Sequence, residues 1–393
     1  MRLTGKTEDI KRRILKGTTM GRAQYLGAIA TLTGCMIGAG IFALPYAVAQ
    51  AGFLTGLFII LLLGIGTLII HLYVGEVCLR THGTFPLTTL AGFYLGKKGK
   101  IAMRTAMILG IYGGLIAYII GEGHTISSLT GLSPFIGILI FLTIFGAILY
   151  FDVNVLGRVE LIIVSLIALL TIGLFSFSMS SVSPHNLALF EPSQLFAPFG
   201  VVLFAYAGVV AIVEMKEEIG DDPKKMKSAI IIGSGIPIVL YTLFAFVVVG
   251  VTGESTTPVA TVGLAEAIGG HALVFGNLFV IAAMGTSFLT NSFALKEVFW
   301  HDYGFSKNAS WALVLFPPAL IAISGLSDFI STLDITGALA SGMIYILAVL
   351  MHRNAKHHGS SNLIYSIRSS TILTTLFVLL FLAGMAYQVV HFI

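Results

Sequence analysis

Two short stretches of small residues could bind a ligand through their backbone rather than through their side chains. Residues 34–40 read GCMIGAG and residues 204–208 read FAYAG, and each stretch interrupts a long apolar run. Glycine permits backbone conformations that unwind a helix, and it lets a ligand approach the main chain closely. Lipid cannot satisfy the N–H and C=O groups that unwinding frees, so such a stretch persists in a membrane only where it lines a cavity or meets a ligand.

The polarity of these freed groups predicts what they bind. A helix that restarts after the first stretch presents free N–H groups at Ala39 and Gly40, and the partial positive charge there suits a carboxylate. The carbonyls of Met36, Phe204 and Ala207 suit an ammonium group. A carboxylate and an ammonium recognised by backbone alone describe the main chain of an amino acid.

A second interpretation of the first stretch is structural. Gly34 and Gly38 are spaced as in the small-residue motif that packs membrane helices together, and the chain has 44 glycines. Taken alone, the first stretch therefore supports packing and binding about equally. The matching interruption at 204–208 favours binding, because paired helix breaks mark the sites of inverted-repeat transporters.

The elements that position these stretches are membrane helices. The chain has 393 residues, of which 56% are hydrophobic and only 10% charged, whereas a soluble domain carries about 25% charged residues. Eleven apolar runs approach or reach the length of a membrane-spanning helix. The predicted spans are 25–48, 53–79, 101–120, 134–150, 159–179, 196–215, 229–251, 273–295, 312–323, 329–351 and 371–390. A further short helix is predicted at 260–268, and Pro317 and Pro318 are predicted to kink the ninth span.

The positions of the basic residues predict the topology. All 22 lysines and arginines fall in the tails and loops that this threading places on one side of the membrane. Basic residues favour the cytoplasmic side, so the N-terminus is expected in the cytoplasm and the C-terminus outside. We expect an integral protein of the plasma membrane. The basic residues flank helices rather than forming a patch, so nucleic acid is not an expected partner, and the two cysteines do not indicate a disulfide framework.

The two interrupted spans run in opposite directions and lie five helices apart, which predicts an inverted repeat. The expected fold is all-α with 11 transmembrane helices, an inverted five-plus-five repeat and discontinuous helices 1 and 6. The expected divisions are a cytoplasmic tail at 1–24, a first repeat at 25–180, a second repeat at 196–352 and an additional helix at 371–393.

These stretches also carry a family resemblance. Residues 37–45 (IGAGIFALP) with 51–53, and residues 204–208 with 217–225, resemble the first and sixth helices of the amino acid/polyamine/organocation superfamily. Residues 75–80 and 94–97 resemble the end of its second helix and the loop that follows. The resemblance is closest to the amino acid/auxin and hydroxy/aromatic amino acid permease branches. It implies a LeuT-like fold and transport of amino acids by alternating access.

The resemblance implies roles for individual residues. Ala39 and Gly40 would bind the substrate carboxylate, the carbonyls of Met36 and Ala207 would bind its ammonium group, and Phe204 would cover it. The family often has serine at the position of Ala39, so a hydroxyl contact is lost here. The full set expected to bind substrate is Met36, Ile37, Ala39, Gly40, Tyr118, Phe204, Tyr206 and Ala207.

The expected pocket offers no counter-ion for a charged substrate side chain. Its side chains come from Met36, Tyr118, Phe204 and Tyr206, with Asn291 as a further candidate. A neutral amino acid of medium or large size, including an aromatic one, is therefore expected. Aromatic residues at helical spacing also fill ordinary cores.

The coupling ion is left open between sodium and a proton, and no other cofactor is expected. By resemblance, sodium would bind five oxygens, which come from the carbonyls of Gly34, Ile37 and Ala283 and the hydroxyls of Thr286 and Ser287. The alternative is that these two hydroxyls bond their own helix, which is common in membrane helices.

Intramembrane ionisable residues are candidates for carrying a proton. Glu122, Glu214 and Asp334 are the predicted proton carriers, and His71 is also placed in a span. Each could instead be a hydrogen-bonded structural residue. Some proton-coupled relatives have a lysine in the fifth helix, but the predicted fifth span has none.

Other function classes have less support in the sequence. Residues 34–40 contain no acidic ligand for a divalent metal, and the chain has no histidine motif of a metalloenzyme and no phosphate-binding glycine loop. An enzyme is therefore not expected. A membrane amino-acid sensor, or a transporter of another small organic solute, remains the alternative. The oligomeric state is left open.

Overall fold

In the computed structural model, the residues described are 21–22, 24–151, 169, 173, 179–268, 271–358, 365–367 and 370–392. Secondary structure among them is helical throughout, and they contain no β-strand. The predicted fifth span, 159–179, lies almost wholly outside the described residues, as does most of the N-terminal tail.

The first span is two helices, Gln24–Met36 and α2 (Ala39–Ala51), which meet at a bend of 49°. The other long helices are α3 (Phe53–Arg80), α4 (Leu87–Thr130), α5 (Pro134–Tyr150), α10 (Pro223–Thr252), α12 (His271–Glu297), α13 (Lys307–Ser324), α15 (Gly342–His358) and α16 (Thr371–Phe392). Shorter helices are α7 (Pro184–Leu187), α8 (Phe199–Ala205), α9 (Ala211–Ile219), α11 (Ala260–Ile268) and α14 (Phe329–Ile335). A π-helical segment, η5 (Thr336–Ser341), joins α14 to α15.

Most predicted spans are confirmed as helices, with differences at their ends. The bounds of α5 and α11 are those predicted. Helix α4 begins 14 residues earlier than predicted and ends 10 later, because a segment kinked at Gly96, with φ of 71°, continues into the span. Helix α13 runs continuously through Pro317 and Pro318 and is longer than predicted at both ends.

Two features of the predicted membrane architecture are present. Within the described residues, six helices are long and apolar enough to cross a membrane, and the bent first pair makes a seventh. The predicted interruption of the first span lies at residues 37–38, and that of the sixth lies at 206–210, between α8 and α9. The total of eleven spans and the limits of the two repeats stay predictions.

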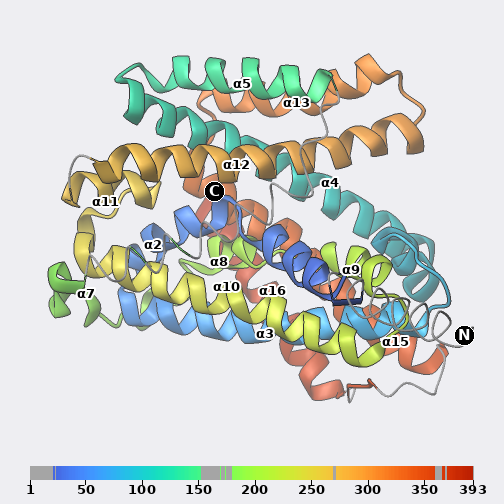
Figure 1. Cartoon of the computed structure of the whole chain (residues 1–393). Helices are drawn as coiled ribbons and strands as arrows, with labels where there is room; N and C mark the ends of the chain where they lie inside the picture. The colour runs from blue at the N-terminus through green and yellow to red at the C-terminus, as the bar shows by residue number, and fades with distance from the viewer. Residues whose placement is uncertain are drawn as a thin grey trace, which may run out of the picture.

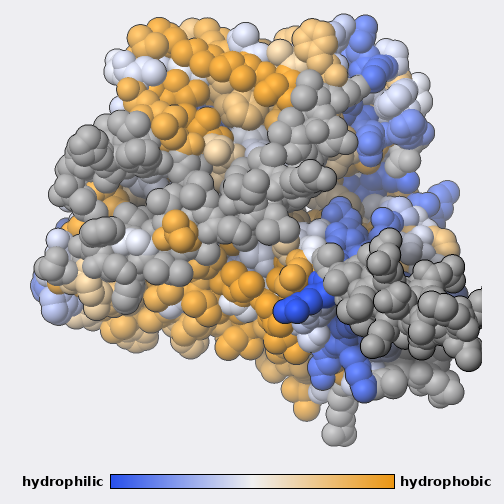
Figure 2. All heavy atoms as spheres, in the orientation of Figure 1, coloured by the Kyte–Doolittle hydropathy of each residue, from blue (hydrophilic) through white to orange (hydrophobic). Residues whose placement is uncertain are grey.

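The helices run broadly side by side, and the two breaks lie in the interior (Figure 1). Helices α5 and α13 lie together at one edge of the view, and α3 and α10 lie at the opposite edge. Helices α4 and α12 pack against each other between these edges, while α2 contacts both α8 and α10. Hydrophilic side chains gather at the end that carries α9 and α15, and apolar ones cover much of the remaining visible surface (Figure 2). That distribution matches a bundle with one strongly polar face.

Local sequence fixes where several helices begin. Ser133 caps α5 by accepting a hydrogen bond from the N–H of Ile136, and Pro134 occupies the first turn. Asp222 caps α10 by accepting from the N–H groups of Lys224 and Lys225. The backbone hydrogen bond from Lys225 lowers the pKa of the Asp222 carboxyl.

A buried carboxylate ties three segments together at the polar end. Glu76 of α3 is fully buried, and its oxygens lie 2.8 Å from Arg80, 3.0 Å from His352 and 3.0 Å from Lys356. The N–H of Ile367 donates to the same carboxylate at 2.7 Å. Helix α3, helix α15 and the segment before α16 are therefore joined through one side chain.

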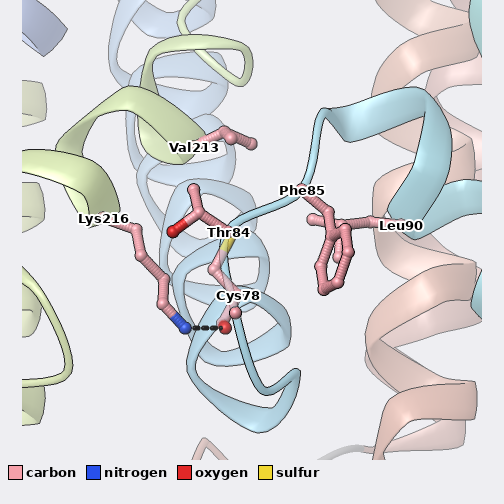
Figure 3. Close-up of a pocket in the computed structure, with 7 residues that line it drawn as sticks. Cys78, Thr84, Phe85, Leu90, Val213 and Lys216 are labelled. Carbon is pink, nitrogen blue, oxygen red and sulfur yellow. Dashed lines mark hydrogen bonds between the residues drawn. The ribbon is translucent and has the colours of Figure 1, made fainter.

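Lys216 joins α9 to the end of α3 close by. Its ammonium group donates to the carbonyls of Cys78 at 2.5 Å and Thr81 at 3.2 Å, and it lies 3.0 Å from Asp221. The small hollow beside it is lined by Cys78, Gly83, Thr84, Phe85, Leu90, Val213 and Lys216 (Figure 3). This hollow lies at the polar end and not at the helix breaks.

Candidate substrate site at two helix breaks

The first break leaves the start of α2 without a side-chain cap. Gly38 occupies the capping position in a non-helical conformation, with φ of −133° and ψ of −140°. Its N–H donates to the carbonyl of Met36 at 3.1 Å, and the N–H of Ile37 donates to Thr33 at 3.0 Å. The first N–H groups of any helix lack acceptors within the helix, so α2 presents donors and a partial positive charge in the interior of the protein.

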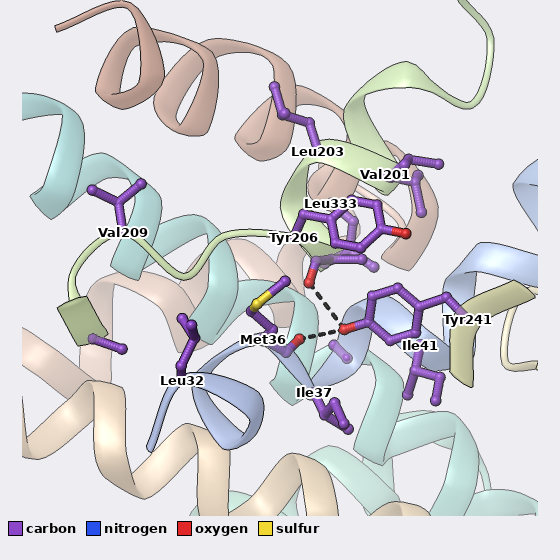
Figure 4. Close-up of a cluster of buried hydrophobic side chains, with 14 of the residues drawn as sticks. Leu32, Met36, Ile37, Ile41, Val201, Leu203, Tyr206, Val209, Tyr241 and Leu333 are labelled. Atoms are coloured by element: carbon purple, nitrogen blue, oxygen red, sulfur yellow. Dashed lines mark hydrogen bonds between the residues drawn. The ribbon is translucent and has the colours of Figure 1, made fainter. Parts of the chain in front are cut away.

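A tyrosine of α10 joins the two breaks. The Tyr241 hydroxyl lies 2.6 Å from the carbonyl oxygen of Met36 and 3.0 Å from that of Ala205, with both as acceptors (Figure 4). Tyr241 is almost completely buried. Because Met36 ends the first helix half and Ala205 ends α8, one hydroxyl stabilises both interruptions at once.

Other carbonyls at the breaks also have partners within the protein. The Tyr345 hydroxyl of α15 donates to the carbonyl of Tyr206 at 2.6 Å. The N–H of Ala207 donates to Phe204 at 3.0 Å, and the Cys35 thiol lies 3.7 Å from the carbonyl of Ala207. The carbonyls of Met36, Phe204 and Ala207 thus each have at least one partner within the protein, whereas the sequence analysis expects them to be free for a ligand. Their part in binding an ammonium group stays a prediction.

Sequence reasoning missed both bridging tyrosines. Tyr241 and Tyr345 lie in apolar spans at no recognisable motif. The available signal was chemical, since a tyrosine hydroxyl buried in a membrane helix usually finds an acceptor. That rule indicates a partner, but it does not say which of many backbone carbonyls is within reach.

The glycines of the first break face two different neighbours. A side chain at Gly38 would meet the Tyr118 hydroxyl at 3.1 Å and the Ser287 hydroxyl at 3.2 Å. A side chain at Gly40 would meet the Cα of Ala205 at 2.5 Å. Gly38 therefore opens toward α4 and α12, whereas Gly40 allows α2 to pack directly on α8.

The structure brings several predicted substrate residues together. Tyr118 is buried, and its hydroxyl and the Ser287 hydroxyl both lie beside Gly38. The rings of Phe204 and Tyr118 both lie against Gly114 of α4. Met36, Ile37, Ala39 and Gly40 are all buried at the break.

Two predicted pocket residues have other contacts. The Tyr206 ring is directed toward α3, where its hydroxyl comes within 2.9 Å of the position of a side chain at Gly64. Asn291 donates to the carbonyl of Ser287 in its own helix at 3.0 Å. Neither contact places these side chains beside Gly38.

Two of the oxygens expected to bind sodium, the Thr286 hydroxyl and the Ala283 carbonyl, bond to each other. The Thr286 hydroxyl lies 3.0 Å from the carbonyls of Ala282 and Ala283, one turn back along α12. The Ser287 hydroxyl lies beside Gly38, as does the Tyr118 hydroxyl. Thr286 thus bonds its own helix, as the alternative interpretation expected, whereas the Ser287 hydroxyl faces Gly38. The five-oxygen sodium shell with Gly34 and Ile37 stays a prediction.

The acidic candidates for proton binding have different environments. Glu122 on α4 is fully buried, and neither carboxyl oxygen has a hydrogen-bond partner among the described residues. Glu214 on α9 is exposed. Asp334 accepts from the N–H of Val201 at 3.0 Å and from the Gln388 amide at 2.6 Å. His71 is buried and lies 2.9 Å from the Ser234 hydroxyl.

Asp334 has a structural task that explains its position. Its carboxylate caps the start of α8 from a neighbouring helix and also binds α16. Replacing Asp334 by asparagine is expected to lower the thermal stability, because the new amide N–H₂ faces one of these two donors. The loss of one such hydrogen bond costs about 1 kcal/mol, which a shift of the unfolding temperature in detergent measures. An unchanged unfolding temperature would contradict the capping role.

A cavity of about 220 Å³ lies next to Asp334, at the start of α8. It is lined by Ala197, Ser331, Asp334, Ile335, Tyr387, Gln388 and His391. The cavity is bordered by α14 and α16 and does not include residues of the first break. It is therefore separate from the cluster at Gly38.

Residues 22–391, nearly the whole chain, match the model of the tryptophan/tyrosine permease family. The chain belongs to this family. Membership places this permease among integral membrane transporters rather than enzymes. The resemblance to a permease superfamily is thus confirmed at the level of the family, and the finer assignment to particular branches stays a prediction.

Curated relatives of this permease cover most of its length. Tyrosine-specific transport system 1 of Haemophilus influenzae is 24% identical over 87% of this chain and 90% of its own. Glutamine transporter 2 of Aliivibrio fischeri is 23% identical over 80% of this chain and 85% of its own. Tyrosine-specific transport system 2 of Haemophilus influenzae is 26% identical over 60% of each chain.

A solved structure shows the fold of this permease. The crystal structure of MhsT in complex with L-phenylalanine covers 93% of this chain and 97% of its own, with a TM-score of 0.65 and 16% identity. The predicted LeuT-like class, with discontinuous first and sixth helices, is therefore confirmed as the fold.

Proposed function

We propose that this protein is a secondary active transporter of neutral amino acids, including large and aromatic ones. It works by alternating access around the two helix breaks and draws on a gradient of sodium or protons. The substrate carboxylate binds the N–H groups of Ala39 and Gly40. The ammonium group binds carbonyls at the breaks, and the side chain packs beside Tyr118 and Phe204.

The observation that carries this proposal is the uncapped start of α2 in the interior of the protein. Helix ends buried without partners are rare, because each free N–H costs free energy when it is kept from water. A carboxylate satisfies such donors and also suits the helix dipole. Gly38, Tyr118 and Ser287 form the adjoining surface from three helices.

The relatives support the amino-acid class of substrate. Two of them are named for tyrosine and one for glutamine, and the structural neighbour holds L-phenylalanine. All three amino acids are neutral, in agreement with a site whose neighbouring side chains, Tyr118, Phe204 and Met36, carry no charge. The protein is proposed to lie in the plasma membrane with its N-terminus in the cytoplasm.

Uptake into proteoliposomes tests the proposal. Labelled tyrosine, tryptophan, phenylalanine and glutamine are offered with an imposed sodium gradient, and separately with an imposed proton gradient. Concentrative uptake of at least one of them is expected under one gradient and not in its absence. Lysine and glutamate serve as charged controls and are expected to stay outside.

Exchange of unlabelled for labelled substrate across the membrane separates binding from coupling. Protein that elutes as a single folded species, yet neither exchanges nor accumulates any neutral amino acid, would contradict the proposed function. Binding of an amino acid without movement across the membrane would instead favour the sensor.

A further inference from the structure

We propose that the carboxyl group of Glu122 takes up and releases the proton that drives transport. This inference rests on the proposed transport function and names the residue that couples it to an ion gradient. It selects one of the acidic residues on the basis of burial and position.

Glu122 lies on the same face of α4 as the substrate site. Residues four apart in a helix share a face, so Glu122 follows Tyr118 by one turn, about 6 Å along the axis. The Tyr118 hydroxyl lies beside the first break at Gly38, as does the Ser287 hydroxyl. The carboxyl group is thus one turn from the residues expected to contact substrate.

Two contacts between α4 and α12 show which part of α12 lies beside Glu122. The Asn277 amide donates to Ser128 at 3.2 Å, and the hydroxyls of Ser287 and Tyr118 both lie beside Gly38, so the two helices run antiparallel. Glu122 lies on α4 between these contacts. Any change in the spacing of α4 and α12 therefore changes the surroundings of its carboxyl group.

Among the described residues, no hydrogen-bond partner stabilises a charge on the carboxyl group of Glu122. Glu122 is 0% exposed, and both of its oxygens lack a hydrogen-bond partner among the described residues. Placing an unpaired carboxylate in such surroundings is very costly, whereas the protonated acid is neutral. The conformation described here is accordingly one in which Glu122 holds a proton.

No charged or titratable group on the described neighbouring helices forms a hydrogen bond with the carboxyl group of Glu122. Helices α2 and α5 carry no charged residue, and η5 carries none. Apart from tyrosines, the titratable residues on the other helices that contact α4, and on α4 itself, are His271, Lys296, Glu297, Lys307, Asp334, His352, Arg353, Lys356, His357, His358, Lys97, Lys98, Lys100, Arg104 and His124. The tyrosines on these helices are Tyr46, Tyr94, Tyr112, Tyr118, Tyr150 and Tyr345. The antiparallel packing places Glu122 level with about Ala283 of α12. His271 is the first residue of α12, and 12 residues of helix, about 18 Å, separate it from Ala283. His124 is exposed, and Asp334 caps α8.

The proton cycle balances without any other reactant. In the outward-open state water reaches Glu122, and the carboxylate gains one proton from the outer solution. Closure around the amino acid then buries the neutral acid. Opening to the inner side admits water again, the O–H bond breaks, and the proton leaves with the substrate.

Replacing Glu122 by glutamine tests this role, because glutamine keeps the shape and stays neutral. In proteoliposomes, the variant is expected to lose accumulation driven by an imposed proton gradient and to keep exchange of unlabelled for labelled amino acid. A pH-sensitive dye trapped in the vesicles should report acidification with substrate for the unaltered protein and none for E122Q. The matched control is Glu254→Gln, which removes an exposed carboxylate in the loop after α10 and is expected to keep both responses.

The outcomes separate the inference from the function on which it rests. Proton-driven accumulation that persists in E122Q overturns the assignment to Glu122 while leaving transport intact. Accumulation by the unaltered protein with sodium alone, and no dye response, also overturns it. Loss of exchange in E122Q, in protein that elutes as folded, gives Glu122 a role in substrate binding and overturns the inference as well. Absence of exchange in the unaltered protein contradicts the proposed function itself.

Discussion

Replacing Gly40 by valine is expected to reduce uptake by about 100-fold, since forcing atoms into a packed interior costs up to about 3 kcal/mol and about 1.4 kcal/mol corresponds to tenfold. A Cβ at this position would lie 2.5 Å from the Cα and 2.6 Å from the Cβ of Ala205. Atoms this close must move apart. Backbone cannot rotate away as a flexible side chain can, so α2 and α8 must separate.

Separation of α2 from α8 disturbs the hydrogen bonds that join the two helix breaks. Tyr241 bonds to Met36 on one side of the contact and to Ala205 on the other. A shift of α8 stretches one of these bonds and moves the free N–H groups of α2 away from Tyr118. Uptake should fall because the parts of the site no longer meet, even where the protein still inserts into the membrane.

Gly235→Val is the matched control for Gly40→Val. Gly235 lies within α10, and a side chain there would meet nothing within 4 Å. Both variants make the same chemical change in a helix, so initial rates of labelled amino-acid uptake, normalised to inserted protein, isolate the effect of the close contact. Equal uptake by the two variants would show that the packing of α2 on α8 is not needed for transport.

Replacing Tyr241 by phenylalanine is expected to destabilise the protein and slow transport together. The change removes the donor for two buried carbonyls and keeps the ring. Leaving a buried polar group without its partner costs about 1–3 kcal/mol, so the unfolding temperature should drop clearly. Substrate exchange should fall by about two- to tenfold if half of that free energy is lost from the substrate-bound conformation.

The adjacent Tyr206 supplies the control for Tyr241. Its ring lies 5.2 Å from that of Tyr241 and is equally buried, but its hydroxyl has no hydrogen-bond partner within the described part of the chain. Tyr206→Phe is therefore expected to leave the unfolding temperature unchanged or to raise it slightly. A similar loss of stability in both variants would refute the view that the Tyr241 hydroxyl bridges the breaks.

Most of the described long helices, and the neighbourhoods of both breaks, could be predicted from the sequence. Hydrophobic length marks a membrane helix strongly, and residues 34–40 combine three glycines in a run that otherwise favours helix. The bounds of α5 follow from Ser133 and Pro134 before it, because these residues act locally. Gly96 shows the limit of this approach, since a kinked but continuous helix gives no apolar signal before residue 101.

The contacts within the site could not be predicted in the same way. The partners of Tyr241 are 36 and 205 residues distant in sequence, and only the packing of α10 against both broken helices brings them together. Asp334 and Glu122 look alike in sequence, as acidic residues near the same end of a span. One has donors from α8 and α16, and the other has none among the described residues.

The break at Gly38 also gives the protein a natural chemical label. The chain has only two cysteines, and Cys35 is exposed beside the break while Cys78 is buried near the polar end. An alkylating reagent therefore distinguishes them without an engineered thiol. The rate of alkylation at Cys35 follows the opening and closing of the site in the unmodified protein, and slower alkylation in the presence of an amino acid measures its binding directly.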